Sequence, residues 1–482
     1  MQPRRLRPFD ASFLALDGPT TVGHVCLLSM LDGPVALADL RAQVGARLHL
    51  VPPLRRRLAM LPLGLDRPWW VDDDAFDLDA HLSETTLPPG SDEATLADQV
   101  GAIAETKLDR ARPLWKLDVI NGLPSGQAAL VTTFHHCLVD GLGSRDLMGI
   151  LFGADGTSPR ADEDDDVADW RPGPLPSPWQ MAFGTVRTVG DVTASAMRIQ
   201  KRSISIVARS AGRVVGVAAA MAGLEATGDG HVGRDGIAHR SPWITAPETP
   251  FNHALTSDRS CSFGVIPVPA SARLRRATGT KVNDVMLAVT AGALRQWLLE
   301  LGALPAAPLV ALVPIGVETA SGACEGNHLG LTLCPLPTHL PDPRERLDRV
   351  HQSMLRAKTE PALTEALLTD LSFVSGPSVT TLFAEVAARV HLADRIRLPF
   401  NLMVSNVPSA RQSWRVAGRI VTRNYPFPPL SDGLGLTIAV VGYGDVLGLG
   451  LLACPVLVPD VWRLRDLLLA AHDELLDAYR WA

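Results

Sequence analysis

The sequence has no apolar run long enough to cross a bilayer and no surplus of basic charge. The nearest stretch, from Val214 to Leu224, is short and is interrupted by Gly216 and Gly223, whereas a membrane-spanning helix needs roughly 20 apolar residues. The formal net charge is −6, and a surface that binds nucleic acid needs a basic stripe. We therefore expect no transmembrane segment and no nucleic-acid partner.

Signals for metal binding and secretion are missing as well. The six cysteines are scattered and form no CxxC pair, so we expect no metal site. Scattered cysteines in a long chain indicate a reducing compartment. Asp10 interrupts the basic N-terminal stretch before the apolar core of a signal peptide can form. These features predict a cytoplasmic protein.

Composition divides the chain into three parts. A length of 482 residues suggests two or three domains at roughly 150 residues each. Acidic residues, Pro and Gly crowd together at 155–178 and predict a surface crossover, and 181–224 predicts one long helix or two shorter ones. The arginines of that helix lie either in water, which we favour, or on an anionic membrane. The predicted parts are 1–154, a crossover and helical segment at 155–240, and 241–482.

A pair of histidines follows a predicted strand in the first part. Residues 115–120 and 128–134 have strand patterns and are separated by a Gly-Pro turn. The sequence His135-His136-Cys137-Leu138-Val139-Asp140-Gly141 comes next, and then a helical pattern. Adjacent residues at a strand end point in opposite directions, so only one histidine can face a given cavity.

This spacing suits acid–base chemistry. An imidazole can accept and return a proton near neutral pH, and a base needs a group that orients it. Asp140 can fold back around the turn as a brace, and Gly141 permits a tight backbone. A covalent route through Cys137 or Ser144 is the alternative. We disfavour it, because no G-x-S-x-G elbow is present and a small buried cysteine is expected.

Two other local patterns stand out. Asn283 is well suited to cap a helix that continues through residues 285–300, with Asp284 in its first turn. The glycine-rich stretch 434–458 alternates like two strands. The run Arg55-Arg56-Arg57 indicates a solvated charged face, with phosphate binding as the alternative.

Further motifs occur in order along nearly the whole chain. They are FDASFLALDGPTTVGHV at 9–25, LRRRLAMLPLGLDRPWWVDDDAFDLDAHL at 54–82, Pro113-Leu114-Trp115, TAPETPFN at 245–252, Asn283-Asp284, Gly326-Asn327 and SNVP at 405–408. Together with HHxxxDG, they resemble the bacterial wax ester synthase/diacylglycerol acyltransferase family.

The resemblance implies a fold and a set of roles. The fold is mixed α/β, with two chloramphenicol-acetyltransferase-like domains joined by the long crossover. His136 is implied to be the general base, with His135 and Asp140 as supporting residues. Pro113-Leu114-Trp115 is implied to shape the region near the substrate, with packing at the strand start as the alternative. Asn283 and Asp284 are linked to activity, with the helix cap as the alternative.

The resemblance further implies an acyl-CoA-dependent O-acyltransferase that acts on diacylglycerol or a long-chain alcohol. Acyl-CoA is a substrate, and no cofactor is expected. Lipid substrates imply transient docking on a membrane or lipid inclusion. The C-terminal half departs from the family pattern at Ser409, at 425–430, at Thr437 and at 313–319. Two alternatives therefore stay open: esterification of a polyketide-like alcohol, and a non-catalytic lipid-binding protein.

Overall fold

The computed structural model describes most of the chain outside the crossover. The described residues are 3–14, 17–60, 67–138, 141–153, 172–177, 246–316, 329–359, 386, 388–395, 397–407 and 413–480. The predicted helices at 181–224 lie outside the described residues. No helix among the described residues is long and apolar enough to span a membrane.

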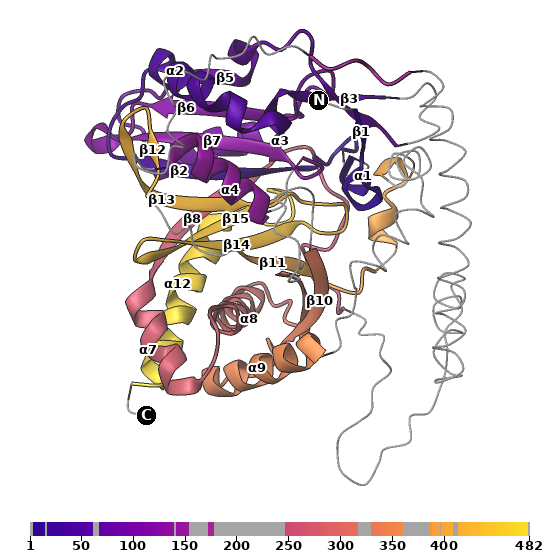
Figure 1. Cartoon of the computed structure of the whole chain (residues 1–482). Coiled ribbons are helices and arrows are strands. Elements are labelled where there is room, and N and C mark those ends of the chain that lie inside the picture. Colours follow the sequence, from indigo (N-terminus) through magenta and orange to yellow (C-terminus); the bar gives the residue numbers. More distant parts are fainter. Residues whose placement is uncertain are drawn as a thin grey trace.

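Two six-stranded sheets form the centre of the molecule (Figure 1). The N-terminal sheet has the order β12-β13-β2-β7-β6-β5. Its strands are β2 (His24–Leu31), β5 (Leu82–Thr86), β6 (Trp115–Asn121), β7 (Ala128–His135), β12 (Arg415–Val416) and β13 (Arg419–Phe427). The strands predicted at 115–120 and 128–134 are thus confirmed as β6 and β7.

The C-terminal sheet has the order β10-β9-β11-β14-β15-β8. Its strands are β8 (Ser260–Pro267), β9 (Leu309–Gly316), β10 (Leu329–Leu336), β11 (Leu402–Val407), β14 (Leu436–Tyr443) and β15 (Val446–Ala453). The two strands predicted within 434–458 are β14 and β15. They pair antiparallel from Leu436 opposite Ala453 to Tyr443 opposite Val446.

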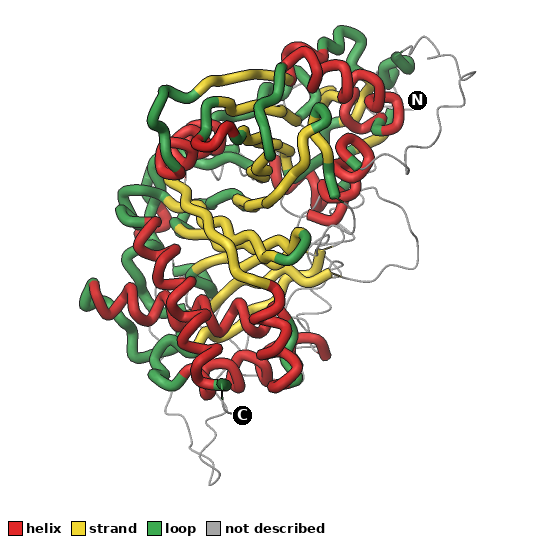
Figure 2. Tube along the Cα trace, turned by 90° about the vertical axis from the view of Figure 1, so that its left-hand side faces the viewer, coloured by secondary structure: helices red, strands yellow, loops and turns green. Residues whose placement is uncertain are grey.

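Most helices cover the outer faces of the sheets (Figure 2), whereas α3 (Glu93–Glu105) packs between the two sheets in one buried cluster with residues of β2, β7 and β8. The helices of the N-terminal half are α1 (Pro8–Leu14), α2 (Leu37–Arg47), α3 (Glu93–Glu105) and α4 (Gly141–Phe152). Those of the C-terminal half are α7 (Val268–Thr278), α8 (Val282–Glu300), α9 (Pro343–Thr359) and α12 (Val461–Ala478). The largest buried apolar cluster lies between the C-terminal sheet and α8, α9 and α12.

A strand from late in the chain completes the N-terminal sheet. Strand β13 pairs antiparallel with β2, although it lies between two strands of the C-terminal sheet in sequence. It also packs against β15, where a Cβ on Gly448 or Gly450 would overlap the carbonyl oxygens of Asn424 and Pro426. The two sheets therefore share one interface, and the glycines of β15 allow their backbones to approach closely.

A small third sheet lies beside α1. It contains β1 (Arg4–Arg5), β4 (Trp69–Asp72) and β3 (Arg56–Ala59) in that order. The predicted charged run of arginines lies here. Arg56 is 3.5 Å from Asp72, and Arg57 is 3.3 Å from both Asp73 and Asp74. Arg56 and Arg57 therefore each lie within 3.5 Å of an acidic side chain on strand β4 or directly after it.

Candidate active site

The two histidines lie at the end of the central strand β7. His135 is the last residue of that strand, and its N–H donates to the Leu114 carbonyl at 3.0 Å. The N–H of His136 donates to the Gly23 carbonyl at 2.9 Å. Hydrogen bonds to segments on both sides therefore fix the backbone of the two histidines.

The ring of His135 is buried between a backbone N–H and a carboxylate. The side chain is 1% exposed. Its Nδ1 accepts a hydrogen bond from the Cys137 N–H at 3.1 Å, and its Nε2 lies 3.3 Å from Oδ2 of Asp17. Because Nδ1 accepts, the ring proton is on Nε2 and faces the carboxylate. This ring is therefore oriented at both ends and anchors the turn that carries His136.

Asp17 and Arg110 complete this support and were not predicted from the sequence. Oδ1 of Asp17 accepts from the Gly23 N–H at 2.7 Å, and its Oδ2 lies 3.0 Å from the Arg110 guanidinium. Burial opposes ionisation of Asp17. The contact with His135, the Gly23 N–H and Arg110 outweigh burial and hold the pKa of Asp17 well below its usual value. The brace of the histidine pair is therefore an ionised carboxylate.

His136 occupies a different environment from its neighbour. Its side chain is only partly buried, and its ring stacks on Phe13 with centroids 4.7 Å apart and an interplanar angle of 18°. Burial lowers the pKa of His136 to about 4. The ring is therefore neutral at physiological pH and can accept a proton.

The space around the pair is tight at Gly23. A Cβ at this position would lie 2.6 Å from the Phe13 carbonyl oxygen and 2.7 Å from Nε2 of His135. The next residue, His24, is 2% exposed, and its Nε2 is 3.1 Å from the Ala104 carbonyl oxygen. A glycine is thus required where the start of β2 passes the histidine pair.

Of the other residues in the HHxxxDG motif, the structure describes Cys137 and Gly141 but not Asp140. Asp140 lies outside the described residues, so its predicted role as a brace stays a prediction. Gly141 is the first residue of α4, in agreement with the predicted start of a helix after the motif. Cys137 is 2% exposed, and burial, together with the charges of Asp10 and Asp17, raises its pKa well above the usual value.

The Pro113-Leu114-Trp115 motif makes packing contacts at the start of β6. Leu114 is fully buried, and its carbonyl oxygen accepts the N–H of His135. The indole N–H of Trp115 donates to the Leu54 carbonyl at 2.8 Å, and its ring stacks on His81 with centroids 4.3 Å apart. These contacts fit the packing interpretation and also hold the end of β7 in place.

Asn283 and Asp284 lie in the C-terminal half. The prediction that Asn283 caps the helix was wrong, because α8 begins at Val282 and its cap is Lys281. The Asp284 carboxylate reaches back to accept the Lys281 N–H at 3.0 Å, which starts the helix earlier. Its Oδ2 also lies 2.7 Å from Nδ1 of His351 in α9, so Asp284 links two helices.

The structure describes some of the remaining sequence motifs and not others. Ser405 and Asn406 lie in β11, whereas Gly326 and Asn327 lie outside the described residues. Thr437, a departure from the family pattern, is fully buried in β14, and its hydroxyl donates to the Pro428 carbonyl at 2.9 Å. Among the described residues, no group of three or more His, Cys, Asp or Glu is arranged to hold a metal ion.

Two domain models of one family match most of the chain. The wax ester synthase/diacylglycerol acyltransferase catalytic domain matches residues 6–286, and the C-terminal domain of the same family matches residues 325–475. Two Mycobacterium tuberculosis relatives that carry the name diacylglycerol O-acyltransferase are each 31% identical to the chain. The alignments cover 98% and 99% of the chain and 90% and 98% of the relatives.

Solved structures support the fold. The wax ester synthase/diacylglycerol acyltransferase from Marinobacter aquaeolei VT8 has a TM-score of 0.63 and 24% identity, over 98% of this chain and 99% of that one. The first condensation domain of the calcium-dependent antibiotic synthetase has a TM-score of 0.55 and 16% identity, over 99% and 98%. The predicted mixed α/β fold is confirmed. The chain belongs to the wax ester synthase/diacylglycerol acyltransferase family and is an acyltransferase.

Proposed function

We propose that the protein transfers a fatty acyl group from acyl-CoA to the hydroxyl of diacylglycerol or a long-chain alcohol, with His136 as the general base. The observation that carries this proposal is the contrast within the histidine pair. His135 is buried and braced by Asp17, whereas His136 is partly exposed, neutral and fixed through its backbone to Gly23. One imidazole is thus the support and the other is the base.

The proposed reaction is a direct transfer. His136 removes the proton of the acceptor hydroxyl while the oxygen attacks the thioester carbonyl. The tetrahedral intermediate collapses to the ester, the carbon–sulfur bond breaks, and the CoA thiolate takes the proton back from His136. An acyl-enzyme on Cys137 is disfavoured, because a buried thiol with a raised pKa is a poor nucleophile.

Positioning of the base is the proposed role of Asp17 and His135. The ionised carboxylate orients the His135 ring, and Nδ1 of that ring holds the Cys137 N–H directly beyond His136. Correct placement of a reacting group to within about 1 Å can be worth roughly 100-fold in rate. The brace would therefore act on the rate through His136 and not by contact with the substrates.

The acceptor can be identified by measuring product and thiol release together. Purified protein is incubated with palmitoyl-CoA and either dioleoylglycerol, hexadecanol or no acceptor, and the esters are identified by mass spectrometry. We expect CoA release that depends on the acceptor and matches ester formed. Ester formation only with a small polyketide-like alcohol would favour the specialised-metabolism alternative. Binding of palmitoyl-CoA without release under any acceptor would favour the lipid-binding alternative.

The proposed substrates also place the reaction at a lipid surface. Diacylglycerol and long-chain alcohols partition strongly into lipid, since each buried CH₂ contributes about 0.8 kcal/mol. We therefore expect transient docking on a membrane or lipid inclusion. Flotation with vesicles that contain dioleoylglycerol tests this docking, and protein that stays in the bottom fraction at every lipid concentration would contradict it.

A further inference from the structure

A small pocket lies beside the turn that follows His136. It has a volume of about 90 Å³, and by the same measure one water needs roughly 10–15 Å³. It therefore has room for a group such as a phosphate, but not for a whole nucleotide. Its walls come from β1, the start of α1, β3, β4, the histidine turn and α4.

Positive charge gathers in this pocket. Arg4, Arg5, Arg7 and Arg56 line it together with two carboxylates, so the lining carries a net charge of +2 in a chain whose net charge is −6. All four arginines are half-buried, and the Arg56 side chain is 12% exposed. Arginines that form pocket walls are suited to a discrete anion, because the planar guanidinium matches a phosphate with paired N–H donors.

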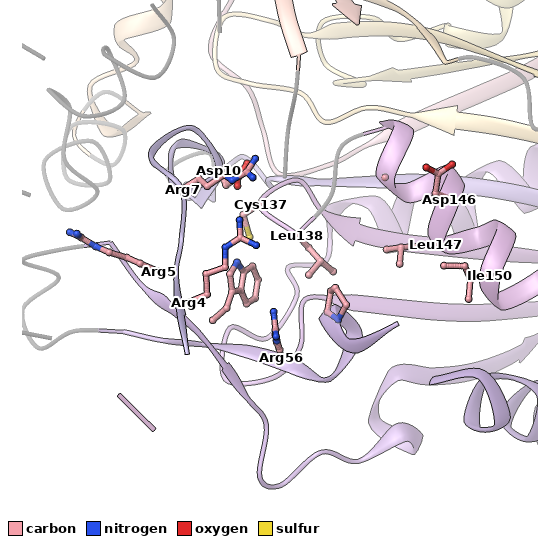
Figure 3. A pocket seen from close by; sticks show the side chains of 13 residues that line it. Arg4, Arg5, Arg7, Asp10, Arg56, Cys137, Leu138, Asp146, Leu147 and Ile150 are labelled. Atoms are coloured by element: carbon pink, nitrogen blue, oxygen red, sulfur yellow. The ribbon is translucent and has the colours of Figure 1, made fainter. Parts of the chain in front are cut away.

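Strand geometry selects which arginines face the pocket. Arg56 lines it and lies 3.5 Å from Asp72 at its edge, whereas the next residue, Arg57, points to the other side of β3 and lies 3.3 Å from Asp73 and Asp74. Figure 3 shows Arg4 and Arg56 extending towards the space beside Leu138. Two arginines from different strands therefore converge on one point.

The pocket adjoins the proposed base. Cys137 and Leu138 line it, and they directly follow His136 in the chain. Asp10 also lines it, and Phe13, one turn further along α1, stacks on the His136 ring. The pocket therefore borders the turn that carries the proposed base.

We propose that this arginine pocket, lined by Arg4, Arg5, Arg7 and Arg56, binds a phosphate group of the CoA moiety of the acyl donor. The inference rests on the proposed function. Diacylglycerol, fatty alcohols and the acyl chain are uncharged. Among the proposed substrates, only the CoA moiety therefore carries negative charge that could pair with the arginines. A phospholipid headgroup is the other source of phosphate. It is disfavoured because the arginines are half-buried walls of a small pocket and not an exposed surface.

Donors with and without phosphate test this assignment. The variants are Arg4→Gln and Arg56→Gln, and the control is Arg57→Gln on the same strand. The donors are palmitoyl-CoA and palmitoyl-N-acetylcysteamine, a thioester that carries no phosphate. We expect each pocket variant to raise KM for palmitoyl-CoA about tenfold, the loss expected for one charge-assisted hydrogen bond. We expect kcat to change less than about twofold, and activity with palmitoyl-N-acetylcysteamine to stay unchanged.

Several results would overturn the assignment. Equal losses with both donors would show that the arginines act on the fold or on the acyl chain. An unchanged KM for palmitoyl-CoA, or a loss in Arg57→Gln as large as in Arg56→Gln, would also contradict it. Reduced flotation with phosphatidylglycerol vesicles and an unchanged KM for palmitoyl-CoA would assign the pocket to a lipid headgroup.

Calorimetric titration of the wild type and the variants with CoA alone separates this inference from the proposed function. Tight CoA binding that is lost in Arg4→Gln would support the pocket even if no acceptor were esterified. Equal CoA affinity in all variants would overturn the pocket assignment even if the enzyme makes ester.

Discussion

The two halves of the molecule each contain a six-stranded sheet, but they use buried polar groups differently. In the N-terminal half, His135, Asp17 and Arg110 converge behind one strand end, and His136 is presented beside them. In the C-terminal half, Asp284 joins α8 to α9, and the buried Asn401 side chain accepts the Val310 N–H. We infer that the N-terminal network supports the proposed chemistry, whereas the C-terminal groups tie structural elements together.

This difference follows from how each network ends. The Asp17–His135 network ends at the Cys137 N–H, directly beside His136, whose imidazole is neutral and partly exposed. The Asp284 network ends at His351, which holds the carboxylate against a second helix. A buried charge pair is weak evidence for function by itself. The adjoining partly exposed base is what distinguishes the N-terminal site.

Among the changes that leave His136 in place, the largest predicted effect comes from Asp17→Asn. The amide keeps the shape of the side chain but removes the charge that orients His135. We expect kcat to fall about 100-fold, because the turn that carries His136 loses its fixed position. KM for both substrates should change little. Steady-state kinetics with palmitoyl-CoA tests this, and a purely structural role would lower the melting temperature and leave kcat per folded molecule unchanged.

Gly450→Ala should separate the two sheets without touching either network. The new Cβ would overlap the Pro426 carbonyl oxygen of β13. Overpacking of this kind costs typically 1–3 kcal/mol, and we expect about 3 kcal/mol here because backbone must move. Urea denaturation measures the loss. The control is Gly149→Ala in α4, where a Cβ meets nothing within 4 Å and a gain of up to about 1 kcal/mol is expected.

Asp284→Asn should destabilise the C-terminal half and leave the chemistry intact. The Asp284 side chain is 6% exposed, and its carboxylate accepts from Lys281 and His351, so loss of the charge should cost about 2 kcal/mol. The control is Asp92→Asn at the exposed cap of α3, where Asn is an equally good cap. A fall of kcat per folded molecule beyond about tenfold in Asp284→Asn would mean that this half also takes part in the reaction.

The smallest predicted effect is that of mild acid on the rate. A base must be unprotonated, and the pKa of His136 is lowered to about 4, so His136 stays neutral from pH 8 down to about 5. We expect kcat per folded molecule to vary less than about twofold over this range. Initial rates at closely spaced pH values test it, and a loss centred near pH 6.5 would show that His136 has an ordinary pKa.

Stability should respond to the same acid range. The pKa of His24 is lowered to about 4 by burial, as is that of His136. In the unfolded chain these histidines take up protons near pH 6.5, so the unfolded state binds more protons than the folded state between roughly pH 6.5 and 4. The free energy of unfolding should therefore fall as pH decreases through this range. The initial rates measured at each pH must for this reason be scaled to the folded fraction.

Local sequence patterns predicted the strands and the histidine turn well. Strands β6, β7, β14 and β15 were predictable because each is a short apolar run between turn residues. The exit of the chain into α4 was predictable from Gly141. The start of α8 was misplaced by two residues, because Asp284 could serve either inside the first turn or beside a cap at Asn283.

Contacts between distant parts of the chain could not be predicted in this way. Asp17 meets His135, and Arg110 meets Asp17, through loops whose local sequence carries no spacing signal. The insertion of β13 beside β2 was equally hidden, because strand pairing depends on partners far away in sequence. Asp17 does lie within the motif at 9–25, so the resemblance marked the segment but did not show which side chain it contributes.

The central claim is that His136 is the base and that the chemistry belongs to the N-terminal half. It is tested most directly by the turnover of His136→Ala with saturating palmitoyl-CoA and acceptor, at a protein concentration corrected for the folded fraction. We expect kcat to fall about 1,000-fold, within the roughly 10²–10⁴ range of general-base catalysis, with CoA affinity unchanged. Turnover within about tenfold of the wild type would contradict the claim.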